Sequence, residues 1–89
     1  MDTIAQEIRD FVIANFLFGQ DGVLVDDQSF LENGIVDSTG VLELVTFLEQ
    51  RFGIAVADRE LLPANLDSVQ NAARFVARKL GANGNGIAG

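Results

Sequence analysis

The sequence contains no cysteine, histidine, tyrosine or tryptophan, and it has one proline among its 89 residues. Without cysteine, there is no disulfide bond, no thiolate nucleophile and no zinc–thiolate site. Without histidine, the chain lacks the side chain that most often acts as a general base near neutral pH and most often binds a metal. These absences argue against an enzyme and against a metal site. Any reactive group is therefore expected to come from outside the sequence.

Long apolar runs and a basic N-terminal segment are also missing. No apolar run approaches the roughly 20 residues that span a membrane, and Met1 is followed by acidic and polar residues rather than by the basic start of a secretion signal. We therefore expect a cytoplasmic protein that does not insert into a membrane.

Positive charge is scarce, with six Lys and Arg against thirteen Asp and Glu. Ten of the thirteen acidic residues fall within residues 1–50. The resulting net charge of −7 disfavours nucleic acid as a partner and attracts basic protein surfaces to the first half of the chain.

The hydrophobic pattern predicts one all-α domain. The expected helices span residues 4–18, 38–52, 58–62 and 68–80, with the third a single turn ended by Pro63. Residues 19–37 form a connection too long for a compact domain unless it has a function. We expect the domain to cover 1–80 and a flexible glycine-rich tail to cover 81–89.

Asp37 and Ser38 stand at the start of the second expected helix. Both residue types are favoured there because their side chains accept hydrogen bonds from free backbone N–H groups. Ser38 as the first helical residue would be exposed, at the positive end of the helix dipole, where a phosphate ester is stabilised. The dipeptide alone is better explained by helix capping.

The wider sequence context resembles the attachment region of acyl carrier proteins. The run from Phe30 to Val45, FLENGIVDSTGVLELV, resembles the segment in which a transferase joins 4′-phosphopantetheine to a serine. The run from Phe47 to Ile54 is similar to the end of that family's acidic second helix, and Leu-Asp-Ser-Val at 66–69 is similar to the opening of its last helix.

This resemblance implies a four-helix carrier-protein bundle, with three main helices, one short helix and a long first loop. It implies that Ser38 bears 4′-phosphopantetheine covalently and that Asp37 helps to hold magnesium during the attachment. The protein would hold an activated acyl or aminoacyl group as a thioester on the arm, as a free-standing monomer that catalyses nothing. The resemblance also implies partner-facing positions on the second helix, which are Thr39, Leu42, Glu43, Thr46 and Glu49.

Three kinds of partner follow from the same resemblance. A phosphopantetheinyl transferase attaches the arm, an adenylating acyl or aminoacyl ligase or an acyltransferase loads it, and a downstream synthase or transferase accepts the thioester. The competing interpretation is an unmodified acidic helical module that docks a basic partner, and that interpretation does not need the Ser38 hydroxyl.

The cargo is indicated by departures from the family pattern at Thr39, Gly40 and Thr46. The family more often has Leu or Met, an acidic residue, and Met at these positions, so the exposed apolar patch is expected to be thin here. The Asp-Ser-Thr-Gly form resembles D-alanyl and other stand-alone aminoacyl carriers. Polyketide and lipid carriers vary at the same positions and stay as alternatives.

Overall fold

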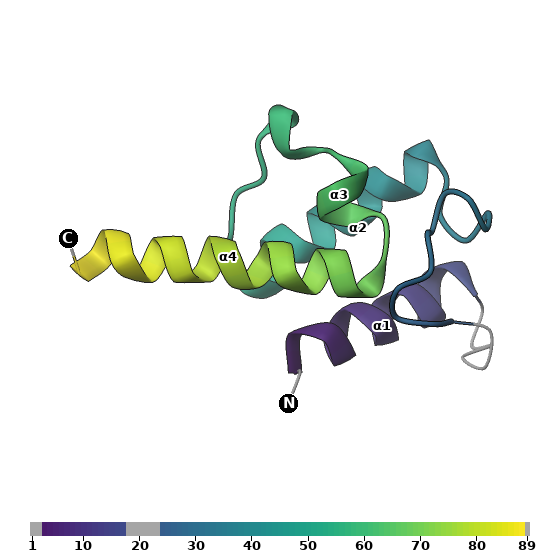
Figure 1. Cartoon of the computed structure of the whole chain (residues 1–89), viewed down its shortest axis with the longest axis horizontal. Coiled ribbons are helices and arrows are strands. Elements are labelled where there is room, and N and C mark those ends of the chain that lie inside the picture. The colour runs from purple at the N-terminus through teal and green to yellow at the C-terminus, as the bar shows by residue number, and fades with distance from the viewer. Residues whose placement is uncertain (1–2, 18–23, 89) are drawn as a thin grey trace.

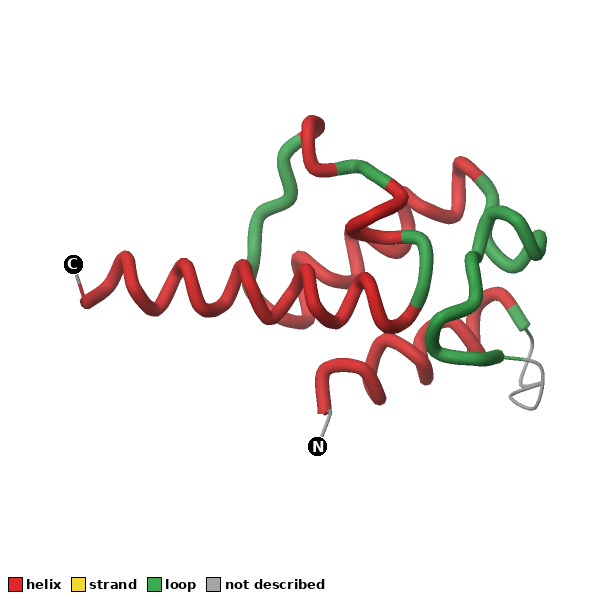
Figure 2. Tube along the Cα trace, viewed as in Figure 1, coloured by secondary structure: helices red, strands yellow, loops and turns green. Residues whose placement is uncertain are grey.

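A computed structural model describes residues 3–17 and 24–88, with side chains for residues 4–17 and 24–81. Its elements are α1 (Thr3–Phe16), α2 (Ser38–Phe52), the 3-10 turn η2 (Asp58–Glu60), α3 (Pro63–Leu66) and α4 (Val69–Ala88). Three of the α-helices are long and one is short, and the described residues contain no strand. Figures 1 and 2 show how loops join these helices. The all-α, four-helix fold expected from the sequence is confirmed.

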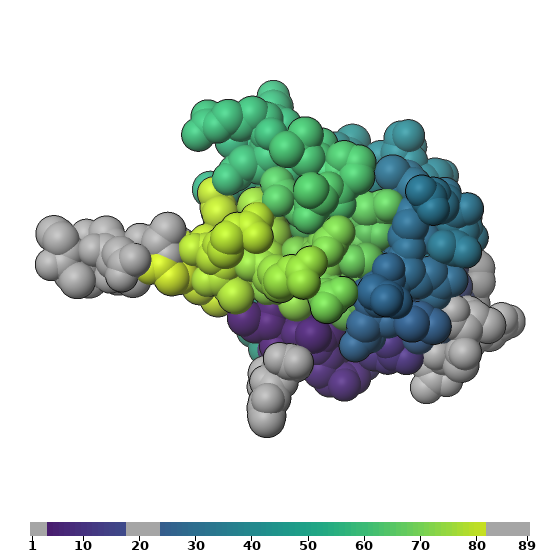
Figure 3. Space-filling view, in the orientation of Figure 1, coloured from purple at the N-terminus to yellow at the C-terminus, as the bar shows by residue number. Residues whose placement is uncertain are grey.

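The core lies where the inner faces of all four helices meet. The long loop over 24–37 adds three buried side chains to it, and Figure 3 shows this loop covering one end of the body against α4. Because these loop residues are buried, the long connection is part of the packed domain. The buried apolar side chains are Ile8, Val12, Leu24, Phe30, Val36, Leu44, Leu48, Ile54, Leu66, Val69, Ala72, Phe75 and Val76.

The second helix has the bounds that the sequence predicted. Asp37 is its N-cap, and Gly53 ends it in the left-handed conformation with φ of 69°, donating its backbone N–H to the Glu49 carbonyl at 3.0 Å. Glycine is favoured at this position because it has no Cβ and adopts the left-handed conformation without a steric penalty. The expected end of the first helix at Phe18 lies outside the described residues.

Two helix boundaries were predicted wrongly. Pro63 was expected to end a turn over 58–62, but it is the first residue of α3. Proline is well suited to that position because the N–H that it lacks has no partner in the first turn of a helix. The last helix was expected to end near Gly81, whereas α4 continues to Ala88 and projects past the other helices (Figure 1).

The physical reason for the longer α4 is that glycine only weakens a helix. Each glycine costs about 1 kcal/mol relative to alanine but keeps its backbone N–H, unlike proline. The division into a domain over 1–80 and a flexible tail over 81–89 stays a prediction.

Glu60 fixes the segment between α2 and α3 to the last helix. Its carboxylate accepts hydrogen bonds from the Ala57 backbone N–H at 2.9 Å and from Lys79 Nζ at 2.9 and 3.1 Å. These contacts, first the Ala57 N–H and then Lys79, lower the pKa of Glu60 below its ordinary value of 4.5. The lowered pKa means that the folded state favours the ionised form of this carboxyl group.

We expect Glu60 to make the stability of the protein sensitive to acid. Because its pKa is lower in the folded than in the unfolded protein, its contribution is complete above pH 4.5 and is lost as the pH falls through the folded-state pKa. In Glu60→Gln the deficit in melting temperature relative to wild type should therefore be largest at neutral pH and shrink in acid. Glu32→Gln, which removes an exposed carboxylate, is the matched control for net charge and should show no such trend.

Candidate attachment site

Ser38 is the first residue of α2 and is exposed. The preceding Asp37 has an extended backbone, and its Oδ1 accepts a hydrogen bond from the Gly40 backbone N–H at 2.7 Å. Its carbonyl accepts from the Val41 N–H at 3.0 Å. The predicted N-cap is thus confirmed. The Ser38 hydroxyl has no hydrogen-bond partner within residues 3–17 and 24–88.

The loop that leads to Ser38 is held in place by Asp67, at the junction of α3 and α4. The Asp67 carboxylate accepts hydrogen bonds from the Ser29 hydroxyl and from the Leu31 N–H, the latter at 2.9 Å. Its carbonyl accepts from the Phe30 N–H at 2.7 Å. One residue therefore ties three consecutive loop residues to the helical body.

Asp67 and Ser68, both residue types that favour helix caps, precede α4, and the structure separates their roles. The Ser68 hydroxyl accepts from the Asn71 N–H at 3.0 Å, so Ser68 caps α4. Asp67 instead binds the loop. No local sequence pattern indicates this role of Asp67, because its partner Leu31 lies 36 residues away. The only signal in the sequence was that a long loop needs hydrogen-bond partners.

Gly40 is buried at the contact between α2 and the end of α1. A Cβ built on Gly40 would lie 2.8 Å from Phe16 Cε1 and 2.9 Å from Val36 Cγ1. The expectation that Gly40 thins an exposed patch is therefore wrong, since this position faces Phe16 and not solvent. Glycine is present because the two helices approach each other too closely for any side chain.

The five predicted partner-facing residues do not share one environment. Thr39, Leu42, Glu43 and Thr46 are exposed, with Leu42 retaining 57% of its accessible surface. Glu49 is half-buried, and its Oε2 accepts a hydrogen bond from the Val56 N–H at 2.9 Å. Glu49 thus fixes the link that follows α2, whereas Glu43 has no partner among the described side chains.

We expect the different environments of Glu49 and Glu43 to appear in the free energy of unfolding of their alanine variants. Glu49→Ala removes an acceptor and leaves the Val56 N–H without its partner, which should lower the free energy of unfolding by about 1 kcal/mol. Glu43→Ala is the matched control on the same helix and should change it by less than about 0.5 kcal/mol. Urea denaturation of both variants measures this, and equal effects would contradict the structural role of Glu49.

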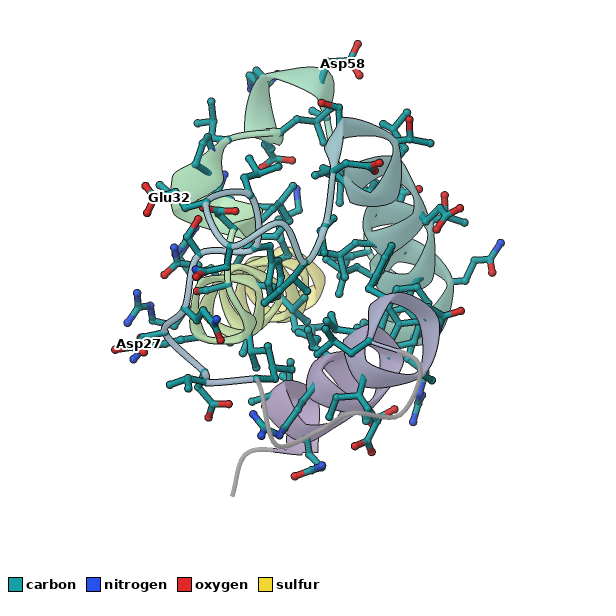
Figure 4. The ribbon with its side chains drawn as sticks, turned by 90° about the vertical axis from the view of Figure 1, so that its right-hand side faces the viewer. Asp27, Glu32 and Asp58 are labelled. Carbon is teal, nitrogen blue, oxygen red and sulfur yellow. The ribbon has the colours of Figure 1, made fainter. Side chains whose placement is uncertain are left out.

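Three exposed carboxylates lie outside the long helices, two on the loop before α2 and one in η2. Asp27, Glu32 and Asp58 are exposed, and their side chains point away from the body (Figure 4). None of the three forms an ion pair with a described residue. Asp27 and Glu32, on the loop that leads to α2, favour the approach of a basic surface there, whereas Asp58 is followed by Arg59 in η2.

Hollows flank the start of α2 on two sides. On the α3 side, an apolar pocket of about 80 Å³ is lined by residues that include Leu31, Val41, Leu62 and Leu66. On the α1 side, a more polar hollow of about 310 Å³ is lined by residues that include Asp37 and Thr39, the two chain neighbours of Ser38. No group of three or more acidic side chains within the described residues could hold a metal ion.

Comparison with known proteins identifies the family. Residues 17–76 match the family model described as "Phosphopantetheine attachment site". The chain belongs to this carrier-protein family. It is 29% identical over 75 residues to "Probable acyl carrier protein PigG" of a Serratia species, covering 84% of this chain and 86% of that relative. It is also 37% identical over 57 residues to an acyl carrier protein of Campylobacter hominis, covering 64% of this chain and 71% of that protein.

Membership of the carrier-protein family establishes the general function. The carrier protein bears a 4′-phosphopantetheine group and holds acyl groups, and it is a carrier and not a catalyst. As a carrier it works with a phosphopantetheinyl transferase and with biosynthetic enzymes. The family match therefore decides against an unmodified interaction module. No helix within residues 3–17 and 24–88 is both long enough and apolar enough to cross a membrane.

Proposed function

We propose that Ser38 is the residue that carries the phosphopantetheine arm. The chain has three serines, and the other two hydroxyls are engaged: Ser29 donates to Asp67, and Ser68 is buried and caps α4. Among the three serines, Ser38 alone has a hydroxyl that is both exposed and without a hydrogen bond to a described residue. This observation carries the proposal.

The position of Ser38 also fits the charge of the group. A phosphodiester on its hydroxyl would lie at the positive end of α2, near backbone N–H groups that lack partners in the first helical turn. Asp37 acts as a positioning residue, because its bond to Gly40 fixes Ser38 at the first helical position. The second carboxylate oxygen of Asp37 is available for the magnesium that the family resemblance implies during attachment. When bound, the arm supplies the thiol that this cysteine-free chain lacks.

The partners dock on the exposed face of α2. Thr39, Leu42, Glu43 and Thr46 are accessible there, and the loop before α2 carries the exposed carboxylates of Asp27 and Glu32. A basic partner surface would pair with Glu43 and with the unpaired carboxylates. Contact through Glu49 also stays part of the proposal, although this residue is half-buried. The partners comprise the transferase, an adenylating ligase or acyltransferase that loads the arm, and a downstream synthase or transferase.

The cargo is a short acyl or aminoacyl group. The apolar pocket beside Val41 supports this, because its volume of about 80 Å³ is small beside the roughly 300–1,000 Å³ of sites that enclose a whole small molecule. A long acyl chain would have to open the core between α2 and α3 or stay in water. An aminoacyl group needs no such shelter.

Attachment is tested by the intact mass of the protein after incubation with coenzyme A and a broad-specificity phosphopantetheinyl transferase. A gain of one phosphopantetheinyl group, located by peptide mass to Ser38, is the expected result. Attachment at any other residue would overturn the assignment.

Cargo size is tested by the melting temperatures of the loaded forms. Each sheltered methylene would add about 0.8 kcal/mol to the stability, so a sequestered long chain would raise the melting temperature strongly. We expect the long-chain and alanyl forms to differ by less than the roughly 4–8 °C that 1 kcal/mol produces in a domain of this size. A large rise for the long-chain form alone would contradict the short cargo.

A further inference from the structure

The apolar pocket on the α3 side of α2 has three walls. Val41 of α2 forms the first wall, three residues after Ser38 and therefore on the same face of the helix. Leu31, from the loop before α2, forms the second. Leu62 and Leu66, at the two ends of α3, form the third. The separation of these walls sets the size of the group that the pocket, with its volume of about 80 Å³, encloses.

The α3 wall is fixed to α4 by hydrogen bonds. Arg78 donates to Asn65 Oδ1 at 3.0 Å, and Asn71 Nδ2 donates to the Pro63 carbonyl at 3.3 Å. Leu66 is itself buried in the core. Moving α3 away from α2 would break both hydrogen bonds and expose Leu66 to water, so this wall resists displacement.

The loop wall depends instead on the side chain of Asp67. Leu31 retains 44% of its accessible surface, so packing holds it only in part. Its backbone N–H donates to Asp67 Oδ1 at 2.9 Å, and the Ser29 hydroxyl donates to Asp67 Oδ2. Asp67 also lines the pocket, directly after the last residue of α3. Its carboxylate therefore joins the loop wall to the α3 wall.

The neighbouring part of the loop is attached without that carboxylate. Phe30 is buried in the core, and its N–H donates to the backbone carbonyl of Asp67 at 2.7 Å. The Phe30 carbonyl accepts from the Ile35 N–H at 2.8 Å, within the same loop. Loss of the Asp67 carboxylate would thus free the N–H of Leu31 while Phe30 keeps the loop attached to the body.

Entry of a longer acyl chain into this pocket requires Leu31 to move outward, and the Asp67 carboxylate then loses its donors. Asp67 is half-buried, so water replaces these donors only in part. A carboxylate left without hydrogen bonds costs free energy that the burial of the first additional methylene group does not offset. A short group fits between the walls without this loss.

We propose that Asp67 sets the upper size of the acyl group that the protein shelters, by holding Leu31 against α3. This proposal rests on the attachment at Ser38 and on the short cargo proposed above, and it adds the residue that imposes the limit. Asp67 is a positioning residue, because it acts through Leu31. Without its carboxylate, the loop turns outward next to Phe30 and the pocket opens to a longer chain.

The test compares two loaded forms of the wild type and of Asp67→Ala. The transferase attaches an arm that carries either a dodecanoyl or an alanyl thioester, and intact mass verifies the loading. The measured quantity is the melting temperature of the dodecanoyl form minus that of the alanyl form. This difference should be small in the wild type. In Asp67→Ala it should increase by about 3–6 °C for each methylene group that the opened pocket shelters.

Two control variants separate this role from a general loss of stability and from the loss of a charge. Ser68→Ala removes the cap of α4 at the next position, which is buried and does not line the pocket. It should lower both melting temperatures equally and keep the wild-type difference. Asp67→Asn removes the charge but keeps an oxygen acceptor for the Leu31 N–H, so it should also keep that difference. An increase in either control as large as in Asp67→Ala would refute the proposal.

An unchanged difference in Asp67→Ala would overturn the role of Asp67 and leave the attachment site and the short cargo intact. A large difference already present in the wild type would contradict the short cargo, and a failure to gain the arm would contradict the attachment at Ser38. Either of these results would also remove the limit assigned to Asp67. Should Asp67→Ala not fold, Ser29→Ala breaks the contact from the loop side. It should increase the difference by a smaller amount, because the Leu31 bond remains, and no increase would again overturn the proposal.

Discussion

Replacing Ser38 with alanine is expected to abolish the gain of one phosphopantetheinyl mass and to leave the fold intact. The Ser38 side chain is exposed and makes no hydrogen bond to a described residue, so its loss should change the free energy of unfolding by less than about 0.5 kcal/mol. Asp37 remains as the N-cap of α2. Intact mass after treatment with coenzyme A and the transferase, together with urea denaturation, measures both quantities.

Ser68→Ala is the matched control for this result, because it should lower the stability of the protein and leave the attachment of the arm unchanged. Ser68 is buried and caps α4, so its removal should lower the free energy of unfolding by about 1 kcal/mol. The folded Ser68→Ala protein should still accept one arm. Modification that persists in Ser38→Ala would show that another residue is the attachment site.

The sequence predicted α2 well because its signals are local and agree with one another. Asp37 begins the helix, Gly53 ends it, and the apolar residues between them recur at helical spacing. Pro63 was misinterpreted because proline both ends one helix and begins another, and a single position does not distinguish the two uses. The role of Ser38 came from the family resemblance, since capping alone accounts for the dipeptide.

The contacts that the sequence did not reveal join residues from separate elements of the fold. Asp67 binds the loop 36 and 38 residues before it, and Phe16 meets Gly40 across the α1–α2 contact. Glu49 accepts from Val56, which lies beyond the end of α2 at Phe52, so the periodicity of the helix does not indicate the contact. These pairings depend on how the helices are placed in space, and periodicity contains no information on that placement.

The close contact between Gly40 and Phe16 predicts a large effect of a substitution at position 40 on the free energy of unfolding. Gly40→Ala should gain up to about 1 kcal/mol from the higher helix propensity of alanine. The new Cβ, however, would lie 2.8 Å from Phe16 Cε1, 2.9 Å from Val36 Cγ1 and 3.3 Å from Asp37 Oδ1. Val36 is fully buried and has little room to move, so the clash forces the end of α1 away from α2.

Overpacking of this kind costs about 1–3 kcal/mol, so we expect Gly40→Ala to lower the free energy of unfolding. The matched control is Gly81→Ala in α4, where an added Cβ has no atom within 4 Å and only the propensity gain remains. That variant should be as stable as wild type or more stable. If the close approach of Phe16 is the cause, urea denaturation should show changes in the free energy of unfolding of opposite sign for the two variants.

A double-mutant cycle isolates that cause. In a Phe16→Ala background the ring that meets the new Cβ is gone, so Gly40→Ala should lose most of its destabilising effect. The coupling between the two positions is expected to be about 1 kcal/mol, within the range found for residues in direct contact. Additive effects of the two substitutions would mean that glycine is needed at position 40 for a reason other than Phe16, with the contact to Val36 the next to be tested.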